Sequence, residues 1–157
     1  MRRRTFTPPA FFFLGVLLGS ALHIFFPIAV MVPTRWNILG LLPLALGIVL
    51  HLLAHKSFHQ TNTTVDPYEK SDILITDGVF SVTRNPMYLG YLSILLAQTL
   101  LFGSLSPIII TVVYFVLVDR ISIPAGEEKM AKDFGADWEE YRKKTRRWLQ
   151  LFMYDSE

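Results

Sequence analysis

The stretch NPMYLGYLSILLAQTLLFGSLSPIIITVVYFVLV, residues 85–118, decides the fold because its 34 residues carry no charge. At 1.5 Å per residue, a single helix of this length measures about 51 Å, whereas the hydrocarbon core of a membrane is about 30 Å thick. The segment GSLSP near its middle, at 103–107, is typical of a turn. The stretch therefore predicts two helices, 86–102 and 107–123, that form a hairpin.

The N-terminal half contains two more long stretches without charge. Of the 157 residues, 52% are hydrophobic and 18% are charged, and no charge lies between Arg4 and Arg35 or between Arg35 and Lys56. A membrane span needs roughly 20 apolar residues, so we expect helices at about 8–31 and 36–58. The first is longer than the apolar segment of a signal peptide and is expected to be retained. The sequence thus predicts an all-α, integral-membrane bundle of four transmembrane helices.

The positive residues predict the orientation of this bundle. The connection before the second helix carries one of them, Arg35, and the turn at 103–107 carries none. Lysine and arginine favour the cytoplasmic side, so both termini and the loop at 59–84 are expected in the cytoplasm. The short loops and the absence of cysteine fit a prokaryotic inner membrane, and the latter excludes disulfides and thiolate ligands. We expect a single domain over residues 1–157.

The C-terminal segment, 124–157, changes character and is expected to be a cytoplasmic, amphipathic helical segment. The sequence Pro124-Ala125-Gly126 predicts a break after the fourth span. Gly135 is typical of a helix end, and Asp137, with Glu140 three positions later, resembles the start of the next helix.

Three histidines recur every four residues near the end of the second predicted helix. His51, His55 and His59 share one helix face, and such spacing can bind a metal. However, the third lies about 12 Å along the axis from the first, and that helix has no acidic residue. We predict no metal site; hydrogen bonds to neighbouring helices or water are the favoured role.

A polar cluster precedes the third predicted helix. Arg84 offers a fork of donors for a carboxylate or phosphate, and Asn85 offers both a donor and an acceptor. Pro86 suits the first turn of a helix, whose free N–H groups favour an anion, and the Tyr88 ring can face a cation. From these residues alone, a snorkelling arginine beside a helix start is the favoured interpretation.

A pair of carboxylates, Glu127 and Glu128, follows the fourth predicted helix. Carboxylates near a membrane are costly unless they are paired or hydrated. If the last two spans form a hairpin, these glutamates and Arg84 lie at the same end of the bundle. The predicted site is therefore assembled from residues far apart in the sequence.

Several motifs occur in an order that resembles the isoprenylcysteine carboxyl methyltransferase family. They are Thr63-Thr64-Val65-Asp66-Pro67, Leu74-Ile75-Thr76-Asp77-Gly78-Val79-Phe80, Arg84-Asn85-Pro86-Met87-Tyr88-Leu89-Gly90, Glu127-Glu128, Phe134-Gly135, Tyr141 and Arg146-Arg147-Trp148-Leu149. The resemblance covers about residues 60–149, and its specificity comes from the combination.

The resemblance implies an integral-membrane enzyme that uses S-adenosylmethionine, enclosed by the last helix pair and the C-terminal segment. By position it assigns cofactor binding to Asn85, Pro86, Tyr88, Glu127 and Glu128. It assigns a catalytic role to Arg84, which would orient a carboxylate of substrate or cofactor, and to Glu128. Asn85 stands where many members have histidine, which removes a titratable group from this position.

The implied acceptor is lipophilic or a small molecule, reached from membrane lipid, with a carboxylate, thiol or amine as nucleophile; no nucleic acid partner is expected. Two other interpretations stay open. One is a non-catalytic scaffold whose basic run at 142–147 binds anionic lipid, at about 1 kcal/mol per basic residue. The other is a membrane reductase of related architecture, which would bind a nicotinamide cofactor without the glycine-rich fingerprint of soluble enzymes.

Overall fold

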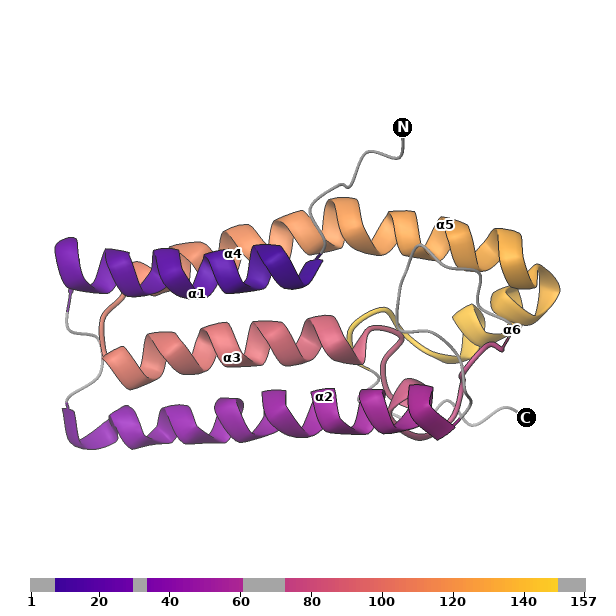
Figure 1. Cartoon of the computed structure of the whole chain (residues 1–157), viewed down its shortest axis with the longest axis horizontal. Coiled ribbons are helices and arrows are strands. Elements are labelled where there is room, and N and C mark those ends of the chain that lie inside the picture. Colours follow the sequence, from indigo (N-terminus) through magenta and orange to yellow (C-terminus); the bar gives the residue numbers. More distant parts are fainter. Residues whose placement is uncertain (1–7, 30–33, 61–72, 150–157) are drawn as a thin grey trace.

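The computed structural model describes residues 8–29, 34–60 and 73–149, and in these ranges the chain forms helices and no β-strand. Figure 1 shows long helices lying side by side, with a smaller helical unit at one end. The elements are α1 (Pro8–Phe25), η1 (Thr34–Gly40), α2 (Leu41–Gln60), η2 (Gly78–Ser81), α3 (Pro86–Phe102), α4 (Ser106–Leu117), η3 (Val118–Ser122), α5 (Ile123–Phe134) and α6 (Ala136–Lys144).

The predicted hairpin of the third and fourth helices is confirmed. Helix α3 has the expected bounds, and Gly103 ends it in the left-handed conformation, with φ of 68°. Its N–H donates to the carbonyls of Thr99 and Leu100, which is the usual way for glycine to terminate a helix. Helix α4 begins at Ser106, with Pro107 in its first turn, and runs back along α3 (Figure 1).

The predicted end of the fourth helix at 123 is wrong, because no break occurs at Pro124. The helix instead continues through the π-helical turn η3 into α5 and ends at Phe134. Proline inside a helix normally loses a hydrogen bond and clashes with the preceding turn. The wider turn directly before Pro124 changes the carbonyl pattern there, which is how a helix accommodates proline without breaking.

The end of the first helix and the start of the second differ from expectation. Helix α1 ends at Phe25, before Pro27, while the predicted end at residue 31 lies outside the described residues. The free backbone groups after it bind Ser106, which donates to Phe26 O (2.6 Å) and accepts from Ile28 N (3.0 Å). The second rod starts as the 3₁₀ helix η1 and becomes α-helical at Leu41, since Pro43 has no N–H for the carbonyl four residues earlier.

Helices α2 and α3 pack closely through small residues. On one side these are Gly47 and Ala54 of α2, together with Gly40 at the end of η1, and on the other Gly90 and Ala97; the two alanines are fully buried. A Cβ on Gly47 would lie 2.7 Å from the carbonyl oxygen of Gly90. Small residues at such spacing let backbones approach in membrane helix pairs, where lipid supplies no hydrophobic driving force.

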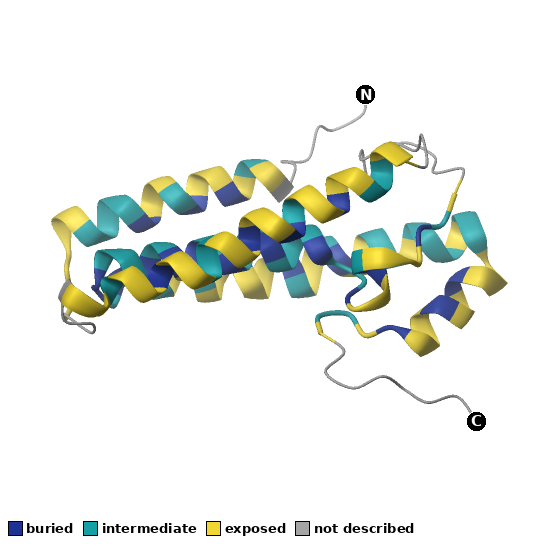
Figure 2. Cartoon of the chain, turned by 90° about the horizontal axis from the view of Figure 1, so that it is seen from below, coloured by how far each residue is buried: buried dark blue, intermediate teal, exposed yellow. Residues whose placement is uncertain are grey.

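Many apolar side chains on the outer faces of the long helices are exposed. Figure 2 shows exposed residues in yellow along these helices. Two helical stretches, Arg35–Gln60 and Ser106–Phe134, are long and apolar enough to cross a membrane; Pro9–Phe25 and Pro86–Phe102 are shorter apolar helices. An apolar surface of this extent is not usual for a soluble monomer. Four crossings remain a prediction, whereas the all-helical bundle is observed.

Helix α6 folds back beside the loop that precedes α3. Gly135, with φ of 52°, separates α5 from α6 and confirms the predicted helix end. The predicted N-cap at Asp137 is wrong by two positions, because Gly135 takes that place and Asp137 lies in the first turn. Trp138 and Tyr141 are buried against Phe80, and the Tyr141 hydroxyl donates to the carbonyl of Phe80 at 2.7 Å.

Candidate functional site

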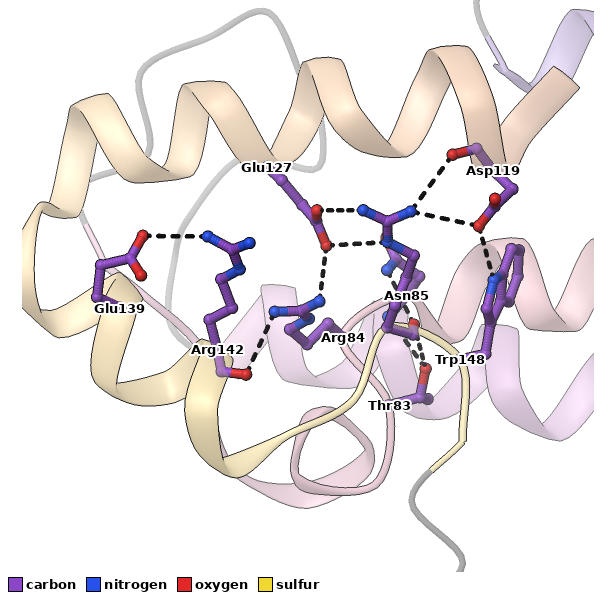
Figure 3. Close-up of polar contacts among 9 residues, drawn as sticks. Thr83, Arg84, Asn85, Asp119, Glu127, Glu139, Arg142 and Trp148 are labelled. Carbon is purple, nitrogen blue, oxygen red and sulfur yellow. Dashed lines mark hydrogen bonds and ion pairs between the residues drawn. The ribbon is translucent and has the colours of Figure 1, made fainter.

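Two polar segments that are far apart in the sequence meet at the end of the bundle where α3 begins. The Arg84 Nη2 atom lies 2.9 Å from Oε1 of Glu127, and their side chains are only 8% and 14% exposed. Figure 3 shows the Glu127 carboxylate between α5 and the loop that carries Arg84. This contact confirms that the arginine and one of the two glutamates share one end of the bundle.

A second arginine, from the segment after α6, completes the network. Arg147 Nη2 lies 2.7 Å from Glu127 Oε2, and its Nε lies 3.4 Å from Oε1. The same guanidinium reaches Asp119 Oδ1 at 3.4 Å, and the indole N–H of Trp148 donates to that oxygen at 2.9 Å. One glutamate thus joins two arginines, and one aspartate anchors the segment that carries the second of them.

Backbone hydrogen bonds tie the same segment to the loop before α3. The amide of Arg84 donates to Arg146 O at 3.1 Å, and Asn85 Nδ2 donates to Arg147 O at 3.0 Å. The hydroxyl of Thr83, which is 1% exposed, donates to the same carbonyl at 3.3 Å. The positions of Arg84 and Asn85 therefore depend directly on residues 146–147.

The electrostatic setting of the two arginines differs. Desolvation lowers the pKa of Arg84, opposed by the charge of Glu127 and assisted by the positive charges of Arg142 and Arg147. The hydrogen bond to Glu127 raises the pKa of Arg147. The Arg84 guanidinium also lies 5.6 Å from the centre of the Trp138 ring, a favourable cation–π distance. Both side chains stay charged, but Arg84 has lost much more of its hydration.

The remaining predicted site residues lie at different depths. Pro86 is buried at the first position of α3, as predicted for a helix start. Tyr88 packs against the core cluster around Tyr114, within the bundle. Glu128 is 68% exposed and pairs with Lys132 on the outer face of α5, an interaction that lowers its pKa. The structure therefore does not bring Glu128 to Arg84, and roles in cofactor binding stay predictions for all of these residues.

Two surface hollows flank this network and share Thr145. The first, of about 520 Å³, is strongly basic; its lining is Arg84, Arg142, Lys143, Thr145, Arg146, Arg147, Trp148 and Leu149. The second, of about 660 Å³, lies between α6 and the loop before η2, and both polar and apolar side chains line it, including Ile73, Asp137 and Tyr141. The site end of the bundle thus has room for a ligand of small-molecule size.

The three histidines of α2 do not converge. The Nδ1 atom of His51 lies 3.0 Å from Gly47 O, one turn earlier in α2, and its ring centre lies 4.3 Å from that of Tyr91 on α3. His55 and His59 are exposed. Across residues 8–29, 34–60 and 73–149, no group of three metal-binding side chains forms.

Comparison with known proteins decides the family. Residues 36–137 match the family model described as phospholipid methyltransferase. The chain belongs to the phospholipid methyltransferase family. This family is part of the group of membrane methyltransferases that resemble isoprenylcysteine carboxyl methyltransferase, which confirms the resemblance seen in the sequence. Membership indicates a membrane methyltransferase.

A relative of this methyltransferase occurs in Haemophilus influenzae. It is an uncharacterized protein, 33% identical over 63 residues, which are 40% of this chain and 100% of the relative. The motif at 63–67 lies outside the described residues. Arg147 and Trp148 lie beyond the family match.

Sequence reasoning gave Asp119, Arg147 and Trp148 no role in this network, and Arg147 was considered only as part of the basic run at 142–147 of the scaffold interpretation. Arg147 and Trp148 were part of the resemblance, but no pattern related them to Glu127. One feature of the sequence does indicate a role for Asp119, because it is the first charged residue after the long uncharged stretch. A carboxylate at the end of an apolar helix is costly unless it has a partner. Only the fold shows that the partners come from residues 147 and 148.

Proposed function

We propose that this membrane methyltransferase moves the methyl group of S-adenosylmethionine to a carboxylate, thiol or amine of a lipophilic or small-molecule acceptor. In this proposal the reaction occurs at the cytoplasmic face of a prokaryotic inner membrane, with both chain termini on that side. The observation that supports it best is the 2.9 Å contact between Arg84 and Glu127. It unites, at one end of an apolar bundle, the two motifs to which the family resemblance assigns the site.

The residues present fit the anionic end of the cofactor. The Nε–H of Arg84 is buried and has no hydrogen-bond partner among the described residues, although it borders a hollow lined by basic side chains. A buried unpaired donor is costly, and an incoming carboxylate would satisfy it. When bound, S-adenosylmethionine supplies a methyl group already activated by its sulfonium.

The chain's own residues would then bind, orient and exclude water. Arg84 holds a carboxylate, while Glu127 keeps Arg84 and Arg147 in place, since its two oxygens already accept from both. Tyr88 offers an aromatic face one turn deeper, suited to a cationic group. Because methyl transfer needs the nucleophile in line with the sulfonium, alignment and a dry site are the main contributions of the protein.

The surroundings of the site suit a lipophilic acceptor. Three apolar side chains next to the network are exposed: Phe115 (41%), Ile121 (64%) and Leu149 (45%). Trp148 links Phe115 to the ion network, with its ring 5.2 Å from that of Phe115 and its N–H on Asp119. An acceptor with an apolar part can therefore approach from the bilayer while its polar end meets the basic hollow.

A transfer assay tests this function. Purified protein is incubated with methyl-labelled S-adenosylmethionine and a panel of membrane lipid extract, thiols, amines and prenylated acids. We expect label in one acceptor class, loss of transfer in Arg84→Gln, and unchanged transfer in the control Arg35→Gln at the opposite end of the bundle. Cofactor binding by Tyr88→Ala and Glu128→Ala tests the two predicted contacts that the network does not include. No transfer and no cofactor binding by the unaltered protein contradict the proposal.

A second candidate function is a lipid-binding scaffold, favoured by the basic residues around the same hollow. Each basic residue near an anionic surface contributes about 1 kcal/mol. Vesicles with and without anionic lipid separate the two functions. Tight binding to anionic vesicles without any cofactor binding supports the scaffold, whereas cofactor binding that is independent of the lipid supports the enzyme.

A further inference from the structure

The π-helical turn η3 brings two carboxylates onto one face of the last long helix. Asp119 lies in this turn, and Glu127 lies eight positions later in α5. In a regular α-helix, at about 100° per residue, residues eight apart point about 80° away from each other. A π turn accommodates one additional residue, which reduces the difference to about 20°. Asp119 and Glu127 can therefore face the same partner.

That partner is Arg147, whose guanidinium bridges the two carboxylates. Its Nη1 lies 3.4 Å from Asp119 Oδ1, and its Nη2 lies 2.7 Å from Glu127 Oε2. The Asp119 side chain is 19% exposed and that of Glu127 14%. Charge-assisted hydrogen bonds with so little exposure are stronger than surface ion pairs.

The main chain of the same residue contacts the motif before α3. Arg147 O accepts from both Asn85 Nδ2 and Thr83 Oγ1, and the neighbouring carbonyl accepts from the Arg84 amide. Arg147 therefore contacts two carboxylates with its side chain and the side chains of Thr83 and Asn85 with its carbonyl, while its neighbour Arg146 binds the Arg84 amide. Residues from three parts of the chain depend on where this one residue lies.

Trp148 provides a second attachment between the segment after α6 and the turn η3. Its indole N–H donates to Asp119 Oδ1 at 2.9 Å, and its ring lies against Phe115 of α4. Asp119 thus receives a donor from each of two consecutive residues. Asp119 itself does not line the basic hollow, whereas its partners Arg147 and Trp148 do.

We propose that Asp119 and Arg147 are positioning residues of the methyl-transfer site, which act by clamping the segment 145–149 to the turn η3 and so hold Arg84 and Asn85 for the cofactor. The inference rests on the proposed function for its ligand. The clamp itself is a property of the fold and has its own readout.

The test compares Asp119→Asn with Asp133→Asn in the full-length purified protein. Asp133 is a matched control: its side chain is also 19% exposed and pairs with a basic residue, Lys129, at 3.8 Å. Among the described residues, it forms no hydrogen bond or ion pair with Arg84, Asp119, Glu127 or Arg147. We expect Asp119→Asn to raise the dissociation constant of S-adenosylmethionine, and the KM in transfer, by roughly tenfold, with a smaller effect on kcat. The control should bind like the unaltered protein, and the two variants should have similar melting temperatures.

Trp148→Phe sharpens the test, because it removes the N–H but keeps an aromatic ring for Phe115. The double variant Asp119→Asn/Trp148→Phe should be no worse than Asp119→Asn alone, since both changes remove the same contact. Arg147→Lys keeps the charge but not the fork, and should resemble Asp119→Asn. Fully additive effects, or equal cofactor affinity in the Asp119 and Asp133 variants, overturn the proposal.

Amide hydrogen exchange reads the clamp without any cofactor. The Arg84 amide, which is bonded to Arg146 O, should exchange faster in Asp119→Asn than in Asp133→Asn. Equal exchange shows that Asp119 does not hold the segment. If the unaltered protein binds no S-adenosylmethionine while amide exchange at Arg84 responds as expected, the proposed function fails and the clamp remains. If methyl transfer is normal but amide exchange is the same in the two variants, the clamp fails and the proposed function remains.

Discussion

The two ends of the helical bundle are both joined by polar contacts, but they use different chemistry. At the site end, charged side chains of Arg84, Asp119, Glu127 and Arg147 form the contacts. At the opposite end, the polar contacts among the described residues are formed by hydroxyl, imidazole and backbone groups. Ser106 binds the carbonyl and amide that follow α1, and His23 binds Ser104 at 2.8 Å.

Neutral contacts of this kind also join the helices partway along the bundle. Gln98 donates to Val16 O and to Ser20. Uncharged groups therefore suffice to connect these helices. Partly desolvating charged groups to connect helices costs free energy that uncharged contacts do not require. We therefore expect the ion network at the other end to serve ligand binding rather than stability.

The largest loss of stability is expected when Glu127, the carboxylate that pairs with both arginines, is removed. Glu127→Ala leaves Arg84 and Arg147 without their common partner, and breaking a nearly buried pair costs about 3 kcal/mol. Chemical unfolding in mild detergent measures the loss. Glu128→Ala is the control: its side chain is largely exposed, so its unfolding midpoint should be unchanged. Equal losses in both variants would show that the network is not the source of the stability.

The close contact of α2 and α3, which lies between the two ends of the bundle, is the next test, because both ends depend on it. Gly47→Val places a side chain 2.7 Å from Gly90 O, which forces α2 away from α3; overpacking of this kind costs about 2 kcal/mol. The thermal midpoint should fall. In Gly126→Ala the new Cβ would meet no atom of the described residues within 4 Å outside the adjoining helix backbone. This variant should raise stability slightly, since alanine favours a helix by about 1 kcal/mol over glycine. A tolerated valine would contradict the observed close contact of α2 and α3.

At the site end, Tyr141→Phe tests the packing that supports the network. The change leaves the carbonyl of Phe80 unpaired in a buried position, at a cost of about 1.5 kcal/mol.

The same tyrosine predicts a pH dependence. Burial raises the pKa of Tyr141 above its usual value near 10. Above that pH the unfolded chain releases the proton while the folded chain retains it, so stability is constant below about pH 10 and falls as the pH rises further. Melting curves between pH 8 and 11 should show a shallower decline for Tyr141→Phe. Parallel curves would mean that this hydroxyl titrates normally.

The smallest effect is expected at the neutral end. Ser106→Ala removes one donor and one acceptor contact, and hydrogen bonds between membrane helices contribute about 1 kcal/mol or less. The thermal midpoint should shift slightly, and methyl transfer should stay normal. Loss of transfer in this variant would show that the two ends are not functionally separate.

Much of this architecture could be predicted from local patterns. The uncharged stretch at 85–118 with its central glycine turn predicts α3 and the hairpin, and the hairpin in turn brings Arg84 near Glu127. The helix through Pro124 could not be predicted in this way, because the π turn that accommodates the proline has no pattern of its own.

The wrong N-cap at Asp137 and the missed contacts of Asp119 and Arg147 both depend on tertiary structure. Asp137 has the composition of an N-cap, yet Gly135 takes that position because the chain reverses there. The roles of Asp119 and Arg147 depend on which way the final segment turns after Thr145, and no local pattern records that direction. Glu127 and Glu128 are equivalent in the sequence, and only helix rotation separates an inward carboxylate from an outward one.

Equilibrium binding of labelled S-adenosylmethionine tests the central claim, that the charged end of the bundle is the cofactor site. The account predicts that the unaltered protein and Ser106→Ala bind with equal affinity, while Glu127→Gln binds roughly tenfold more weakly or worse, because Arg84 and Arg147 lose their shared charge. Equal affinity in Glu127→Gln and Ser106→Ala would contradict it.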